Sequence, residues 1–163
     1  MPRKEYLLIF QDLAFFLTGK ADVARFDTTI HPWGYAPDWE YQLSREETYV
    51  APKDPEGIPL RRYPSLGDQY LMSRIATFGL AHWNRWLKSK SQESRREFLR
   101  IADWLLKFPD GRYVHDFAVG GMKPGWISCI SQGEAASVLT RAYALTEESK
   151  YRLDQYNYSI YVM

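Results

Sequence analysis

The sequence predicts an all-α protein of helical hairpins, with an extended N-terminal arm and a short β-hairpin as a possible addition. Three observations predict this class. From Asp68 onward, apolar residues recur at steps of three and four, the period of amphipathic helices. Six of the nine prolines lie between His31 and Pro64, where they disfavour regular helix. Two similar serine- or threonine-led segments, at 91–94 and 146–149, lie 55 residues apart, a spacing typical of stacked hairpins in an (α/α) toroid.

Length and composition indicate one globular domain in two parts, an N-terminal helix and arm over 1–65 and a helical-hairpin region over 66–163. The net charge is +1, from 21 basic and 20 acidic residues, which provides no field for nucleic acid. Cys129 is the only cysteine, and the three histidines are scattered. We therefore expect no disulfide within the chain, no metal site and no nucleic-acid partner.

The N-terminal part is expected to begin with a helix from Glu5 to Leu17 that ends at Thr18-Gly19. Its apolar run is interrupted by Gln11 and Asp12 and is too short to span a bilayer. The sequence therefore predicts no transmembrane span and no clear signal peptide. A cytoplasmic and an exported location both remain open.

The arm between His31 and Pro64 is rich in aromatic residues as well as proline. Its prolines favour extended or turn structure. It is either a wrapping arm ordered by its aromatic side chains or a loose linker, and the aromatic content favours the ordered arm. The aromatic residues in question are Trp33, Trp39, Tyr41 and Tyr49.

Two helices and a strand are predicted after the arm. The first helix extends from Tyr70 to about Lys88, and a polar break at 89–91 ends it. A second helix, capped by Ser91 or Ser94, stops before the Pro-Asp-Gly turn at 109–111. Residues 112–117 then alternate like a short strand, and a glycine-rich loop follows at 120–125.

A third helix is predicted from about Ser131 to Leu145, because Ser131 and Glu134 fit the capping box. Gly133 and the small residues after it leave room for either another backbone or a bulky ligand. Thr146 is the expected N-cap of a fourth helix that begins at Glu147. Two hairpins do not close a toroid, so we expect a fragment, a shortened paralogue, or a chain completed by a homodimer or partner.

Two stretches resemble the C-terminal domain of D-glucuronyl C5-epimerases. Ser128-Cys129-Ile130-Ser131-Gln132-Gly133, with Arg141-Ala142-Tyr143, is similar to the family's Ser-Ala-Met-Ala-Gln-Gly segment and its trailing Arg-Ala-Tyr. A patch from Asp54 to Pro59, followed by Tyr63, Gln69-Tyr70 and the helix at 75–81, resembles the beginning of the same domain, in the same order. The resemblance covers roughly Asp54 to Tyr151, and two ordered patches are more specific than one.

The resemblance implies a uronate C5-epimerase that acts on glucuronyl residues within an acidic polysaccharide, without an organic cofactor. The C5 hydrogen is alpha to a carboxylate, so its removal creates an enolate that needs fixed positive charge or hydrogen-bond donors. One group removes the proton on one face of the sugar, and another returns a proton on the opposite face. The sequence must therefore supply two proton carriers and a carboxylate clamp.

The candidate site residues combine suitable chemistry with a position in or near the resembling patches. For each, burial in the core or a surface role is the open alternative. The candidates for the carboxylate clamp are Arg141, Arg74 and Arg112, and Arg141 is preferred because it falls in a resembling patch. The candidate proton carriers are Tyr113, His115 and Tyr143, and the candidate substrate-binding residues are Gln69, Tyr70, Trp126, Gln132 and Arg141.

The sequence departs from the family at two places. Ile127 stands where a functional tyrosine is expected, and the family's later catalytic tyrosines would lie beyond Met163. These departures predict glycan binding with incomplete catalytic machinery. Two other functions remain open: an acidic-polysaccharide lyase, which shares the C5 proton abstraction, and a non-catalytic glycan-binding or interaction module.

Overall fold

The computed structural model describes residues 25–26, 34, 37–45, 49–108 and 110–153. The helix predicted from Glu5 to Leu17 lies outside the described residues, as do Trp33 and the segment from residue 154 onward.

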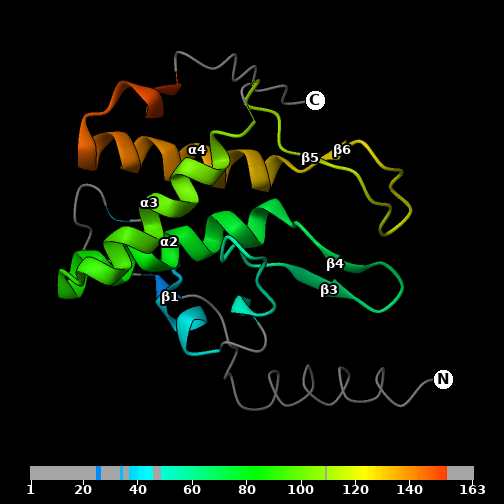
Figure 1. Ribbon diagram of the computed structural model, residues 1–163, viewed down its shortest axis with the longest axis horizontal. Helices are drawn as coiled ribbons and strands as arrows, with labels where there is room; N and C mark the ends of the chain where they lie inside the picture. The colour runs from blue at the N-terminus through cyan, green and yellow to red at the C-terminus, as the bar shows by residue number, and fades with distance from the viewer. Residues whose placement is uncertain (1–24, 27–33, 35–36, 46–48, 109, 154–163) are drawn as a thin grey trace.

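Three long helices build the core of the described part: α2 (Met72–Ser89), α3 (Gln92–Leu105) and α4 (Cys129–Thr146). Figure 1 shows that α2 and α4 begin at the same end of the bundle, while α3 returns in the opposite direction. Each of the three packs against the other two, and their apolar faces supply most of the buried core. The predicted helical class is confirmed, with one complete helical hairpin, α2–α3, in this part of the chain.

The hairpin between α2 and α3 forms where the sequence predicted it. Lys90 adopts a left-handed conformation (φ 55°) and ends α2, with its N–H donating to the Trp86 carbonyl at 2.8 Å. The Ser91 hydroxyl then accepts the Ser94 N–H at 3.3 Å and caps α3. Of the two predicted caps, Ser91 is therefore the one used.

At Gly79 on α2, both of the other long helices approach closely. A Cβ at this position would lie 2.9 Å from Ile101 Cγ2 on α3 and 3.6 Å from Val138 Cγ2 on α4. Gly133 on α4 is different, because a Cβ there would meet no atom within 4 Å. The small residue that permits close helix packing is therefore Gly79, and Gly133 faces open space.

This contrast predicts opposite effects for the same substitution. Gly79→Ala is expected to lower the free energy of unfolding by about 1–2 kcal/mol, because overpacking against Ile101 outweighs the better helix propensity of alanine. Gly133→Ala is expected to raise it by up to about 1 kcal/mol, because alanine gains propensity without a clash. Urea unfolding of both variants measures the difference, and equal effects would contradict this packing.

The described part of the arm is ordered against α2. β1 (Arg25–Phe26) pairs with β2 (Pro37–Asp38), and the 3-10 helix η1 (Glu40–Ser44) packs on α2. Lys88 Nζ on α2 lies 2.6 Å from Asp38 Oδ2 and 2.9 Å from Glu40 Oε2. The Tyr41 ring contacts both Trp39 and Tyr49. The ordered arm, and not the loose linker, is thus confirmed for these residues.

Two antiparallel hairpins project from the end of the bundle where α2 and α4 begin (Figure 1). The first pairs β3 (Arg61–Tyr63) with β4 (Gly67–Gln69). The second pairs β5 (Val114–His115) with β6 (Trp126–Ile127), and His115 lies opposite Trp126. The strand predicted over 112–117 is therefore present but shorter. Its pairing with β6 brings the start of α4 close to the bundle.

The predicted capping box at the start of α4 is wrong. The N-cap is Ser128, whose hydroxyl accepts the Ser131 N–H at 3.3 Å, and the helix begins at Cys129. Ser128 can cap as well as Ser131 can, and the β5–β6 pairing places Ser128 at the turn. Ser131 and Glu134 consequently lie inside the helix, on its buried face.

The fourth helix predicted from Glu147 is also wrong. Glu147 is left-handed (φ 58°) and ends α4, so Thr146 is the last residue of a helix and not the first cap of another. The Thr146 hydroxyl instead donates to the Ala142 carbonyl at 2.8 Å. A single 3-10 turn, η3 (Ser149–Tyr151), follows, and Tyr151 Oη donates to Asp103 Oδ1 on α3 at 2.7 Å.

Among the described residues, no helix is both long and apolar enough to cross a membrane.

Candidate functional site

Four of the predicted site residues come together where the β5–β6 hairpin meets the start of α4: Tyr113, His115, Trp126 and Gln132. The His115 and Trp126 rings are stacked, 3.8 Å apart and 5° from parallel. Trp126 Nε1 donates to the Phe117 carbonyl at 2.7 Å. The indole of Trp126 therefore has one face covered by His115 and its polar atom bonded within the hairpin.

His115 connects this hairpin to the first turn of α2. Its side chain is 1% exposed, and Nε2 accepts the Met72 N–H at 3.3 Å. This N–H is one of the donors that a helix start leaves without a partner, and Leu71, the N-cap, has no side-chain group to serve it. A ring nitrogen that accepts a hydrogen bond carries no proton, so Nδ1 holds it and faces the Trp126 carbonyl at 3.4 Å. Burial also lowers the pKa of His115, which favours this neutral form.

Gln132 holds the loop before β5 against α4 with both ends of its amide. Oε1 accepts the Tyr113 N–H at 2.8 Å, and Nε2 donates to the Gly111 carbonyl at 2.8 Å. The Tyr113 side chain is fully buried, with its ring 5.4 Å from that of Phe108. In this arrangement Tyr113 and Gln132 serve the packing of the loop, and the tyrosine has no surface open to a polymer.

Gln69 and Tyr70 lie apart from this cluster, beside the β3–β4 hairpin. Gln69 Nε2 donates to the Leu66 carbonyl at 2.7 Å. The Tyr70 hydroxyl donates to Asp54 Oδ2 at 2.7 Å, and this bond to a carboxylate raises the pKa of Tyr70 to about 12. Tyr70 is 40% exposed, and the centroid of its ring lies 5.3 Å from that of Trp104.

Arg141 and Tyr143 lie near the other end of α4. Arg141 is nine positions after Gln132, about 14 Å along a helix. The Arg141 guanidinium donates to the Ser137 carbonyl at 3.1 Å and to the Gly34 carbonyl at 2.9 Å. Tyr143 is 38% exposed. The candidate clamp is therefore well separated from the His115–Trp126 stack.

Two polar side chains of α4, which the sequence predicted to form a capping box at the helix start, are buried in the structure. The Ser131 hydroxyl and Glu134 Oε2 are buried and have no hydrogen-bond partner among the described residues. Burial raises the pKa of Glu134 to about 7. The helical period could have indicated the burial of Glu134, because this residue lies one turn before the apolar Val138 and on the same face.

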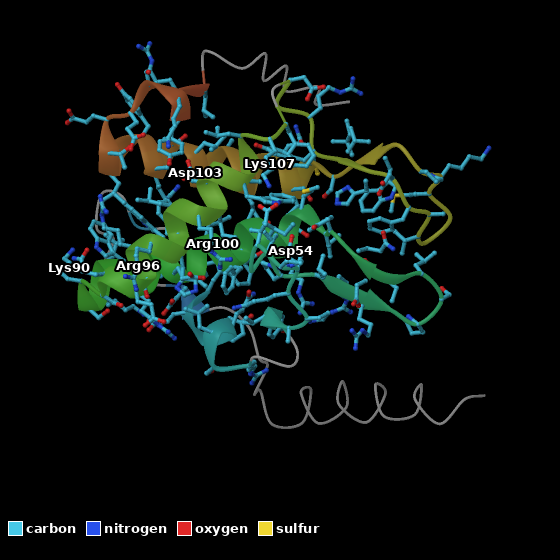
Figure 2. All side chains as sticks on the ribbon, in the orientation of Figure 1. Asp54, Lys90, Arg96, Arg100, Asp103 and Lys107 are labelled. Carbon is cyan, nitrogen blue, oxygen red and sulfur yellow. The ribbon has the colours of Figure 1, made fainter. Side chains whose placement is uncertain are left out.

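A groove of about 390 Å³ extends along α3 and was not predicted. Figure 2 shows Arg96, Arg100 and Asp103 following one another along α3, with Lys107 just past its end. All four line the groove. Their steps of four, three and four residues place them on one helix face, so the spacing could have indicated this row of charges.

A comparison with protein-family models relates the C-terminal part of the described chain to known proteins. Residues 103–158 match the model of the D-glucuronyl C5-epimerase C-terminus. The family expected from the sequence is confirmed for this segment. No curated protein and no solved structure matches the chain.

The D-glucuronyl C5-epimerase C-terminus match contains β5, β6, α4 and η3. All the predicted site residues except Gln69, Tyr70 and Arg74 fall within it. The Asp54–Pro59 patch and most of the groove along α3 lie outside it. Ile127, which stands where a tyrosine of the epimerase family was expected, is 40% exposed in β6.

Proposed function

We propose that this protein recognises glucuronyl residues in an acidic polysaccharide. The observation that carries the proposal is the match of residues 103–158 to the D-glucuronyl C5-epimerase C-terminus. The matched segment is a well-packed unit, in which Gln132, His115 and Trp126 hold the hairpin against α4 and α2. Such packing gives a fixed surface on which a polymer can bind without a large ordering cost.

C5 epimerisation is the second candidate, and two observations favour it. The first is the family match, and the second is the exposure of Tyr143, a possible proton carrier on α4. A proton carrier must lie within hydrogen-bond reach of the sugar. Tyr113 and His115 are buried, so their use in catalysis requires the β5–β6 hairpin to move. Recognition without turnover is therefore the function that the geometry supports best.

Incubation with a heparosan-type polymer in deuterated water separates these functions. Recognition alone predicts binding by calorimetry and no deuterium at C5 above the protein-free control. Deuterium at C5 would instead establish epimerisation, and an unsaturated product that absorbs in the ultraviolet would establish a lyase. The absence of both binding and exchange would contradict the proposal.

A further inference from the structure

We infer that the groove along α3 is a binding subsite for a glucuronyl carboxylate of the polymer, centred on Arg96. This inference rests on the proposed function and adds a location that lies largely outside the family match. At about 390 Å³, the groove is within the range of small-molecule sites.

The walls of the groove combine an apolar surface with cationic groups. Ile58, Leu99 and Trp104 contribute the apolar part, and Trp104 packs against the half-exposed ring of Tyr70. Arg96, Arg100 and Lys107 contribute the cations. A pyranose carries an apolar C–H face and, when it is a uronate, a carboxylate at its edge. An apolar wall flanked by arginine and lysine is complementary to both features.

Each acidic residue of the groove is already paired with a lysine of the protein. Glu56 forms an ion pair with Lys107. Asp103 Oδ1 lies 2.9 Å from Lys150 Nζ and accepts the Tyr151 hydroxyl proton at 2.7 Å. These contacts leave little negative potential to repel an anionic ligand.

Arg96 is the cation that these contacts leave available. Among the described residues it forms no ion pair and no side-chain hydrogen bond, and its side chain is exposed. Arg100, one turn further along α3, is held by Glu97 and by the Glu56 carbonyl. Arg96 can therefore turn its fork toward a carboxylate without giving up a protein contact.

The opposite wall is fitted closely to α3. Asp54 to Ile58 forms a tight turn, in which the Gly57 N–H donates to the Asp54 carbonyl at 2.9 Å and the Ile58 N–H donates to Asp54 Oδ1 at 2.8 Å. Gly57 has φ +79°, and a Cβ there would overlap the Arg100 guanidinium. The turn thus fixes the width of the groove and the position of Arg100.

Arg96→Gln tests the inference, with Arg95→Gln as its matched control. Both changes remove one positive charge from the same helix turn, but Arg95 does not line the groove. We expect Arg96→Gln to weaken calorimetric binding of a heparosan-type polymer roughly tenfold, through loss of a charge-assisted hydrogen bond, and Arg95→Gln to change it less than about twofold. Both variants should melt near the wild-type temperature, because neither arginine side chain forms an ion pair or a hydrogen bond among the described residues.

The possible failures are distinguishable. If the wild type binds the polymer and the two variants bind equally well, the groove is not the subsite, while the proposed function stands. If the wild type binds neither this polymer nor one with its carboxylates reduced to alcohols, the proposed function and the subsite are both overturned. Equal wild-type affinity for the two polymers would also overturn the carboxylate subsite.

Discussion

Gln132→Ala is expected to lower the free energy of unfolding by about 2–4 kcal/mol. The substitution removes two hydrogen bonds, to the Tyr113 N–H and the Gly111 carbonyl. Loss of the bond to the Gly111 carbonyl costs about 1 kcal/mol, and loss of the other costs ~1–3 kcal/mol because it leaves a buried donor without a partner. The Tyr113 N–H would be left in this state, because it lies against α4. Urea unfolding at neutral pH measures the loss.

Gln69→Ala is the matched control for this prediction. It removes an amide of the same chemistry, which donates to the Leu66 carbonyl at the exposed β3–β4 turn. Solvent can replace that bond, so we expect a change below about 0.5 kcal/mol. Similar losses for the two variants would show that the amide of Gln132 does not hold the loop.

Glu134→Gln is expected to stabilise the protein at alkaline pH by roughly 3 kcal/mol, because a pKa difference of one between the folded and unfolded chain corresponds to about 1.4 kcal/mol. Burial raises the pKa of Glu134 to about 7 from an ordinary value of 4.5. The unfolded chain therefore loses this proton at lower pH than the folded chain does. The ionised group destabilises the fold progressively as pH rises from about 4.5 to 7, and the full effect is present above 7.

The pH dependence of the gain distinguishes this cause from a packing effect. At pH 8 the gain should be near its maximum, and at pH 5 it should fall below about 1 kcal/mol, because the folded carboxyl is then protonated. Glu93→Gln, which removes an exposed carboxylate from the first turn of α3, is the matched control, and it should not gain stability at pH 8, because that carboxylate is favourable at a helix N-terminus. Urea unfolding of both variants at the two pH values gives the comparison, and a gain that does not vary with pH would contradict the account.

The helical framework was predictable wherever local signals agreed with one another. The α2–α3 hairpin followed from its apolar period and from the polar turn that ends in Ser91. The start of α4 was not fixed locally, because Ser128 and Ser131 are both good N-caps, and strand pairing at Trp126 decides between them. A two-residue strand such as β6 carries almost no periodic signal, so tertiary contacts alone reveal it.

The sequence indicated which residues form the candidate site better than it indicated which of their side chains are exposed to solvent. Residue type drew attention to Tyr113 and His115 as proton carriers, but the helices packed over them determine that they are buried. Gln132 was correctly placed near the start of α4, although its amide is bonded within the protein. Arg96 was overlooked, because a groove forms only when the Asp54–Ile58 turn packs against α3.

The most direct test of the account is a calorimetric titration of the intact chain with a heparosan-type polymer and with the same polymer after its carboxylates are reduced to alcohols. Recognition of glucuronyl residues predicts saturable binding of the first polymer and binding at least roughly tenfold weaker for the second, because charge-assisted hydrogen bonds to the carboxylates are lost. No binding of the glucuronate polymer, or equal binding of both, would contradict the central claim.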